Sequence, residues 1–337
     1  MILTKDTCQK LFDSFNNQKI LVIGDVMIDS YLWGKVERVS PEAPVPVVAV
    51  KKRENRLGGA ANVALNLKSL GAKPILCSVI GNDSKGNEFI ELLKNKNLSF
   101  KGIIKSNKRI TTTKFRVFGN NSQMIRVDEE IVSDIIKNDF EDLLSVISEL
   151  INSGDVKAIV FQDYNKGILT KGLISDVIAL ANAKNIHVVV DPKKKNFDEF
   201  KNIDLFKPNL KELQEGLKME VDPEKDSVLN EAVDKLHLQQ NIKIVLTTLS
   251  EKGVFISTKI SEKEFQKHLI PAHIRSISDV SGAGDTVISV AALCLVAGLS
   301  GKDIAAISNL AGGIVCEEVG VVPINRELLF NEIMKMY

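Results

Sequence analysis

Short apolar runs rich in β-branched residues alternate along the chain with longer segments of helical periodicity. Strands are predicted at five such runs: Ile20–Ile23, Ile75–Ile80, Ala158–Phe161, His187–Val190 and Ile242–Thr247. Helices are predicted between and after them, at Asn62–Leu70, Lys85–Asn95, Ile131–Asn152, Ile174–Ala183 and Val228–Leu238. Strands that alternate with helices predict an α/β fold, in which a parallel sheet is covered on both faces. Ligands of such sheets bind at the carboxyl ends of the strands.

Two stretches, residues 30–55 and 111–128, interrupt this alternation. The first contains three prolines between two apolar runs, and the second has two alternating runs around Gly-Asn-Asn, as is typical of a hairpin. We expect them to form a small antiparallel sheet outside the main one, although two surface hairpins without a function would show the same pattern. Its apolar residues are Val47, Val48, Val50, Phe115, Val117, Met124 and Ile125. Because such a face needs cover, we expect a homodimer that pairs through this sheet.

Composition excludes several classes of protein. The 337 residues carry 44 Lys and Arg against 43 Asp and Glu, with one Trp and three Tyr, so neither a basic surface nor a base-stacking platform for nucleic acid is expected. No apolar run has the length of a membrane span, and the N-terminus lacks the apolar stretch of a signal peptide. The four cysteines are far apart, which favours buried thiols in a reducing cytoplasm over a metal or redox site. We therefore expect a cytoplasmic single-domain protein without a membrane partner.

The sequence Asp279-Val-Ser-Gly-Ala-Gly-Asp285-Thr, followed by an apolar run, is the sharpest chemical feature. The backbone N–H groups of Gly282, Ala283 and Gly284 would lie at a helix start, where they can bind developing negative charge. Asp285 would stand at the same helix start, where it can accept a proton. A flexible entry into a buried helix, with Asp285 as a favourable first-turn charge, is the alternative interpretation.

Two further motifs carry candidate binding residues. Gly58 and Gly59 allow close approach of a ligand to the backbone, and Asn62 offers a donor and an acceptor to hydroxyl groups. Tight packing of a helix on a sheet would also explain them. Asn209 and Glu212 share one helical face, but the same spacing is typical of a capping box. The two interpretations are compatible, because a helix start can also present a carboxylate that bridges a metal.

These motifs, in this order over about residues 20–325, resemble the signatures of the ribokinase-like (pfkB) carbohydrate kinase family. The resemblance implies a three-layer α/β/α fold with a mostly parallel central sheet and a small β-sheet lid formed by residues 30–55 and 111–128. It implies that Asp285 is the base that deprotonates the sugar hydroxyl, and that the amides of Gly282, Ala283 and Gly284 form the anion hole. Ser281 stands where Thr is more usual, which is a conservative departure.

The resemblance also implies the remaining contacts. The sugar would be bound by Gly58, Gly59, Asn62 and an acidic residue after the first strand, for which we favour Asp29, with Asp25 as support. The nucleotide would be bound by Asn209, Glu212, Thr247, Ser250, Gly253 and Asn309. Asn209 and Glu212 would hold Mg²⁺ through water. The cofactors implied are ATP and Mg²⁺, with a monovalent cation such as K⁺ left open.

Within the family, the run Ser40-Pro-Glu-Ala-Pro-Val-Pro-Val47 resembles the heptose 7-phosphate kinases, as do the segments that begin at Gly24, Arg56, Asp163 and Asp191. This resemblance implies phosphorylation of the anomeric C1 hydroxyl of D-glycero-β-D-manno-heptose 7-phosphate, in the ADP-heptose route to bacterial lipopolysaccharide. Since the chain stops at Tyr337, the adenylyl step would need a separate nucleotidyltransferase. A kinase for fructose 6-phosphate or ribose, and a catalytically silent regulator of the same fold, are the alternatives.

A sugar phosphate requires cations that a free sugar does not need. The candidates are Arg38, Lys114, Arg116 and Arg126 in the two non-alternating stretches, and Lys166 and Lys193 after core strands. Because basic residues are also common on solvated hairpin faces, the sequence does not choose among them.

Overall fold

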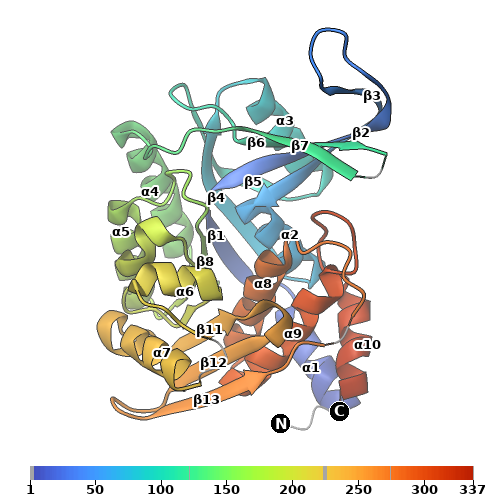
Figure 1. Cartoon of the computed structure of the whole chain (residues 1–337). Helices are drawn as coiled ribbons and strands as arrows, with labels where there is room; N and C mark the ends of the chain where they lie inside the picture. The colour runs from blue at the N-terminus through green and yellow to red at the C-terminus, as the bar shows by residue number, and fades with distance from the viewer. Residues whose placement is uncertain (1–3, 121, 223–225, 274, 337) are drawn as a thin grey trace.

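The computed structural model of the chain describes residues 4–120, 122–222, 226–273 and 275–336, and contains a large and a small sheet (Figure 1). The large sheet has nine strands that run in the same direction except for β12, which pairs antiparallel with both β11 and β13. From one edge to the other, they are β13 (Phe265–Ile270), β12 (Val254–Lys259), β11 (Ile244–Thr248), β10 (Leu205–Phe206), β9 (His187–Asp191), β8 (Val156–Gln162), β1 (Lys19–Gly24), β4 (Lys73–Gly81) and β5 (Ser99–Ser106). This arrangement confirms the predicted mostly parallel sheet.

Helices cover both faces of the large sheet, because its central strands are apolar on both sides. In β1, Ile20 and Val22 belong to one hydrophobic core, whereas Leu21 and Ile23 belong to the other. The first core is completed by α1 (Lys5–Phe15), α2 (Ala60–Ser69), α3 (Ser84–Asn95), α8 (Ala283–Val296), α9 (Gly301–Val315) and α10 (Arg326–Met336). The second is completed by α4 (Lys137–Asn152), α5 (Lys171–Ala183), α6 (Leu210–Leu217) and α7 (Asp226–Gln240). The three-layer α/β/α fold is thereby confirmed.

The small sheet, called the lid sheet below, forms from the two stretches that interrupt the alternation. Its strands are β3 (Pro46–Gly59), β2 (Val26–Val39), β6 (Thr113–Gly119) and β7 (Ser122–Glu129), in that order. The expectation of a purely antiparallel sheet was wrong, because β2 and β6 are parallel. The amide of Ile28 donates to the carbonyl of Thr112, so the chain enters β6 beside the start of β2 and runs in the same direction. Asn121, in the predicted turn, lies outside the described residues.

Some predicted boundaries were also wrong. The helix expected from Ile131 begins at Lys137, because the Arg109 guanidinium donates to the carbonyls of Ile131 and Ser133 and holds this segment as a loop. The elements α1, α10, β5, β12 and β13 were not predicted. Strand β13 is a partly exposed edge strand, and its sequence lacks the continuous apolar run that predicts a buried strand. The four cysteines are buried and free, as expected. Among the described residues, no helix is both long and apolar enough to span a membrane.

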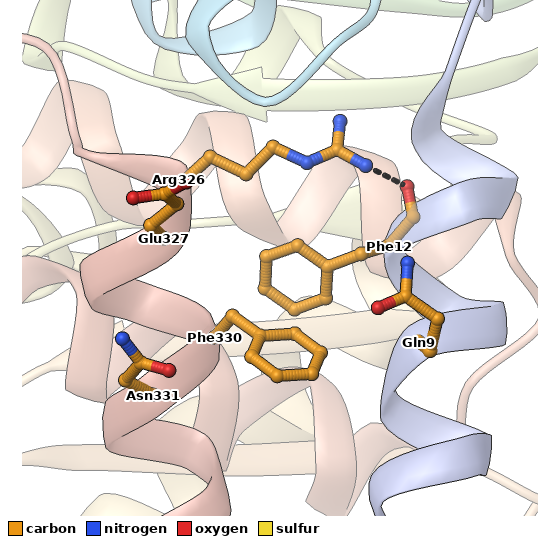
Figure 2. Close-up of a pocket in the computed structure, with 6 residues that line it drawn as sticks. All are labelled: Gln9, Phe12, Arg326, Glu327, Phe330 and Asn331. Atoms are coloured by element: carbon orange, nitrogen blue, oxygen red, sulfur yellow. Dashed lines mark hydrogen bonds between the residues drawn. The ribbon is translucent and has the colours of Figure 1, made fainter.

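A surface hollow lies between α1 and α10 (Figure 2). Arg326 crosses it and donates to the carbonyl of Phe12 over 2.8 Å, and the rings of Phe12 and Phe330 meet edge to face at 5.3 Å. Gln9, Glu327 and Asn331 complete its lining. These contacts hold the two terminal helices together. None of the predicted site residues lines the hollow, so it is not the candidate site.

Candidate active site

Asp285, the predicted base, lies in the first turn of α8 and is only 4% exposed. Its Oδ1 accepts hydrogen bonds from Gln162 Nε2 (3.1 Å) and from the Tyr164 hydroxyl (2.7 Å). Its Oδ2 accepts one from Asn62 Nδ2 of α2 (2.8 Å). Burial raises the pKa of Asp285 to about 6, although the donors Asn62 and Tyr164 act in the opposite direction. A carboxylate with this pKa is ionised at neutral pH and can accept a proton.

The predicted anion hole forms the N-terminus of α8. Gly282 is the N-cap, and its φ of 85° lies in the left-handed region that favours glycine. The amide of Ala283 donates to the carbonyl of Val280 over 3.3 Å, whereas the amide of Gly284 has no backbone acceptor among the described residues. Because the first amides of a helix point along its axis, Gly284 supplies a free donor beside the Asp285 carboxylate.

A buried ion pair flanks this helix start. Lys207 Nζ lies 3.0 Å from Asp191 Oδ2, and both side chains are at least nine-tenths buried. A Cβ atom added at Gly284 would lie 3.6 Å from this ammonium group, so the cation stands next to the free amide. Gln162 Nε2 also donates to Asp191 Oδ2 over 3.1 Å and thereby links Asp191 to Asp285.

Sequence reasoning missed Gln162, Tyr164, Asp191 and Lys207 as site residues. Gln162 and Asp191 are the last residues of β8 and β9, and Lys207 follows β10. Their position was a usable signal, because polar residues at the carboxyl ends of parallel strands gather at one edge of the sheet.

The predicted sugar-binding glycines lie against the two acidic residues that follow β1. A Cβ atom at Gly58 would lie 2.1 Å from Asp29 Oδ2, and one at Gly59 would lie 2.4 Å from the Asp25 carbonyl oxygen. Asp25 is buried and accepts hydrogen bonds from the backbone amides of Tyr164 (2.8 Å), Lys166 (3.1 Å) and Ile168 (3.1 Å). Its carboxylate therefore holds the loop after β8, which fits the supporting role expected of it.

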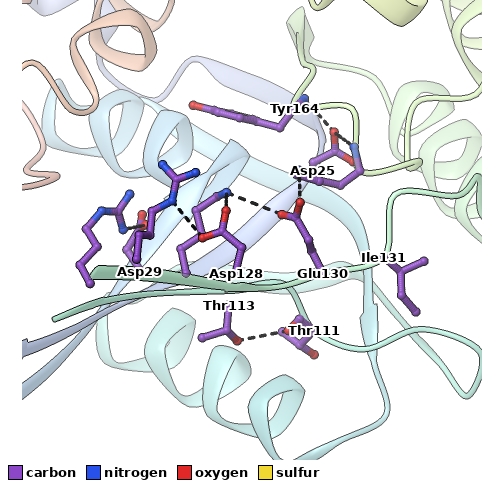
Figure 3. A network of polar contacts seen from close by, with 12 residues as sticks. Asp25, Asp29, Thr111, Thr113, Asp128, Glu130, Ile131 and Tyr164 are labelled. Atoms are coloured by element: carbon purple, nitrogen blue, oxygen red, sulfur yellow. Dashed lines mark hydrogen bonds and ion pairs between the residues drawn. The ribbon is translucent and has the colours of Figure 1, made fainter. Parts of the chain in front are cut away.

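Four of the candidate cations share three carboxylates along the lid sheet, and Figure 3 shows Asp29, Asp128 and Glu130 in this network. Arg116 pairs with Asp29, which is 4% exposed at its side chain. The remaining pairs are Lys114 with Asp128 (3.0 Å) and Glu130 (3.6 Å), Arg126 with Asp128 (3.1 Å), and Lys166 with Glu130 (2.6 Å). These four cations are called the lid cations below, and they exceed their acidic partners by one charge.

The other two candidates lie elsewhere. Arg38 is exposed near the end of β2. Lys193 pairs with Glu212, and its ammonium group lies 5.7 Å from the centre of the Tyr164 ring. Lys193 is therefore placed beside the predicted nucleotide motif and not among the lid cations.

The Asn209 and Glu212 pair forms a complete capping box at the start of α6. Asn209 Oδ1 accepts from the Glu212 amide, and Glu212 Oε2 accepts from the Asn209 amide, each over 2.8 Å. Each carboxylate oxygen of Glu212 has one donor, from Lys193 or Asn209, and keeps a second lone-pair position. This donor set fits a hydrated Mg²⁺ held through water, since its free lone pairs can accept hydrogen bonds from metal-bound water.

The other predicted nucleotide residues lie at the end of β11, in the turn that follows it, and in the middle of α9. A bridge between Asn209 and Thr248 places β11 beside α6. The hydroxyl of Thr247 is buried and has no hydrogen-bond partner among the described residues. Ser250 and Gly253, with φ of 54° and 93°, form the tight turn into β12. On α9, Nδ2 of the Asn309 side chain donates to the carbonyl of Pro271 over 2.8 Å.

Known proteins of similar sequence match most of this chain. "Bifunctional protein HldE" of Helicobacter pylori (strain G27) is 40% identical over 303 residues, which are 90% of this chain and 64% of that protein. The protein of the same name from Sulfurimonas denitrificans is 40% identical over 311 residues, which are 92% of this chain and 63% of that protein. The chain thus spans less than two thirds of the length of these relatives.

The fold is shared with known sugar kinases. Phosphofructokinase-2 from Escherichia coli in complex with potassium superposes with a TM-score of 0.75 at 17% identity, over 95% of this chain and 99% of that one. Ribokinase from Arabidopsis thaliana, complexed with ribose and ATP, gives 0.69 at 18% identity, with the same coverage. The model of the pfkB family of carbohydrate kinases matches residues 17–327. The chain therefore belongs to the pfkB family and, as its motifs predicted, is a carbohydrate kinase.

Proposed function

We propose that this kinase transfers the γ-phosphoryl group of ATP to the anomeric C1 hydroxyl of D-glycero-β-D-manno-heptose 7-phosphate, in the cytoplasmic ADP-heptose route to lipopolysaccharide. The observation that carries the chemical part is the buried Asp285 carboxylate beside the free amide of Gly284. An assay of ADP release over a panel of sugars and sugar phosphates tests the proposal. Faster turnover of fructose 6-phosphate or ribose would contradict it.

The site supplies the parts of an in-line transfer. Asp285 accepts the proton of the C1 hydroxyl while that oxygen attacks the γ-phosphorus atom, and ADP leaves. The amide of Gly284 and the ammonium group of Lys207 stabilise the negative charge on the transferred group. Asn209 and Glu212 would hold hydrated Mg²⁺, whose charge would offset that of the ATP phosphates. A bound monovalent cation such as K⁺ is compatible with this scheme.

The lid cations support a phosphorylated substrate. Lys114 and Lys166 are 14% and 16% exposed at their side chains, so they are partly shielded from bulk water and still accessible to a ligand. A charge-assisted contact in such a place contributes on the order of 1.5–3 kcal/mol. Among the residues expected to bind the sugar, Asp29 pairs with the lid cation Arg116 and lies against Gly58, whereas Asn62 donates to Asp285, so this set extends from the lid cations to the base and would allow C1 and the distal phosphate to be bound at the same time.

We expect Glu212→Gln to raise the Mg²⁺ concentration needed for half-maximal rate. Gln at this position retains the capping box, so the helix start is preserved, whereas the charge that attracts hydrated Mg²⁺ is lost. Rates measured against Mg²⁺ concentration test this expectation. Glu215→Gln, on the same helix, is the control. A change confined to the melting temperature would leave Glu212 with the capping role alone.

The lid sheet has two chemically different faces, because side chains alternate along each strand. Strand pairing aligns Asp29 with Lys114 and Lys114 with Asp128, which puts the ionic residues on one face. The same pairing aligns Val117 with Ile125 on the other face. The apolar residues of this second face include Leu32, Phe115, Val117, Ile125 and Val127. Ile125 and Val127 are 55% and 46% exposed, so part of the apolar face lacks cover in one chain.

We therefore expect a dimer whose lid sheets cover each other, and we expect Ile125→Glu to dissociate it. A carboxylate at the centre of an apolar interface loses hydration without gaining a partner. Sedimentation velocity at micromolar concentration measures the change. Ile260→Glu, which alters a residue that is 56% exposed outside the lid sheet, is the matched control. A fully active monomer of the unaltered protein would refute an obligatory dimer.

A further inference from the structure

We propose, resting on the function proposed above, that Gln162 and Tyr164 are positioning residues that fix Oδ1 of Asp285 and leave its Oδ2 to accept the sugar proton. Gln162 ends β8, and Tyr164 lies two residues further on. Both side chains reach the same carboxylate oxygen from this strand end.

The two carboxylate oxygens of Asp285 differ in how many hydrogen bonds they already accept. Each oxygen of an ionised carboxylate has about two lone-pair positions. Oδ1 accepts from Gln162 Nε2 (3.1 Å) and from the Tyr164 hydroxyl (2.7 Å), so both of its positions are filled. Within the described part of the chain, Oδ2 accepts only from Asn62 Nδ2 (2.8 Å) and keeps one position free. The free position thus lies on the oxygen next to Asn62, the residue expected to bind the sugar.

The chemistry of the two donors fixes their direction. Gln162 lies 3.1 Å from two carboxylates, those of Asp285 and Asp191, and both can only accept when ionised. Its amide nitrogen must therefore face them, because the amide oxygen would be repelled. Burial, together with the charges of Asp285 and Asp191, raises the pKa of Tyr164 well above its usual value. The phenol consequently remains a donor throughout the neutral range.

Tyr164 is itself held in place on several sides. Its backbone amide donates to Asp25 Oδ2 over 2.8 Å, as Figure 3 shows, and Lys193 stands over its ring. The other charged groups that act on this part of the site are the Asp191–Lys207 pair at the ends of β9 and β10, and the Asp29–Arg116 pair of the lid sheet. Both pairs retain their charge in the variants described next.

Tyr164→Phe and Gln162→Met test the positioning roles through the pH dependence of kcat/KM. Donors stabilise the charged carboxylate, so removing one raises the pKa of Asp285, and the acid limb should move upward from about pH 6 by roughly one pH unit. Without one of these donors, the Asp285 carboxylate can rotate. We therefore expect kcat at pH 8 to fall by about three- to tenfold and KM for ATP to be unchanged. Tyr31→Phe is the control, because the Tyr31 hydroxyl accepts from the Val321 amide over 3.4 Å and does not contact Asp285. The acid limb of the pH profile of this variant should not move.

The outcomes separate this proposal from the proposed function. If Tyr164→Phe keeps both its acid limb and its kcat, or loses only thermal stability, the positioning role is overturned. This variant removes a single hydroxyl group, so it decides the question even if Gln162→Met fails to fold. Full turnover of Asp285→Asn would instead overturn the proposed base, whatever the two positioning variants show.

Discussion

Replacing Asp285 by Asn should lower kcat by at least ~10², because general-base catalysis typically contributes a factor of about 10²–10⁴. Asn has nearly the same shape, so it keeps the volume of the buried site, but it cannot take the proton of the sugar hydroxyl. Binding of ATP should be largely retained, since the predicted nucleotide motifs lie on β11, α6 and α9, whereas Asp285 lies on α8. Steady-state kinetics, together with a titration of ATP binding, measures both effects.

Asp139→Asn is the matched control for this variant. Asp139 is also a buried aspartate in the first turn of a helix, and it accepts a hydrogen bond from Ser106 over 2.6 Å. The structure places it outside the site, so its replacement should change stability more than turnover. Near-normal turnover of Asp285→Asn would show that another group removes the proton.

The second large effect concerns the distal phosphate of the substrate. Heptose 7-phosphate should exceed unphosphorylated heptose in kcat/KM by roughly tenfold or more, since a charge-assisted contact contributes ~1.5–3 kcal/mol and several cations can share one phosphate. The phosphate is remote from C1, so its binding energy also helps to orient the reacting hydroxyl. Kinetics with the two sugars under identical conditions gives this ratio.

Lys114→Met is the most informative lid variant. The ammonium group of Lys114 pairs with Asp128 and Glu130. Each of these carboxylates also pairs with another cation, Asp128 with Arg126 and Glu130 with Lys166. Removal of the Lys114 ammonium group should therefore shrink the preference for the phosphorylated sugar without leaving a buried charge unpaired. Arg116→Met is less clean, because it would strand the buried Asp29 at a cost of about 3–5 kcal/mol.

Lys52→Met supplies the comparison for Lys114→Met. Lys52 is a lysine of the lid sheet that is 66% exposed and paired with Glu54. We expect its replacement to leave the sugar preference unchanged. Arg126→Met, Lys166→Met and Lys193→Met complete the series. If none of these variants reduces the preference, the phosphate is bound elsewhere.

Sequence patterns predicted the parts of the molecule that depend on local chemistry. The run Ile20–Ile23 is apolar at every position, as a strand buried on both faces requires. The string that ends at Asp285 carries its own helix start, so the position of the proposed base and of the amides beside it at the start of α8 was predicted from one short segment. The capping box of Asn209 and Glu212 was likewise visible in the spacing alone.

Features that depend on distant contacts were not predictable in this way. Gln162, Asp191 and Lys207 are single polar residues at three strand ends, and only the parallel pairing of those strands brings them together. The late start of α4 depends on Arg109, which holds the preceding loop from more than twenty residues away in the sequence. The parallel contact of β2 with β6 follows from the path of residues 107–112, which no local pattern specifies.

Phosphorus NMR of the reaction of the unaltered protein with ATP, Mg²⁺ and D-glycero-β-D-manno-heptose 7-phosphate tests whether this kinase phosphorylates C1 of the heptose. We expect a second sugar phosphorus signal to appear as ATP is consumed, and we expect this phosphorus to couple to the anomeric proton, which identifies the 1,7-bisphosphate. A second phosphate on any other carbon would contradict the assignment to C1. Absence of a second sugar phosphate, while the same protein phosphorylates fructose 6-phosphate or ribose, would contradict the heptose assignment.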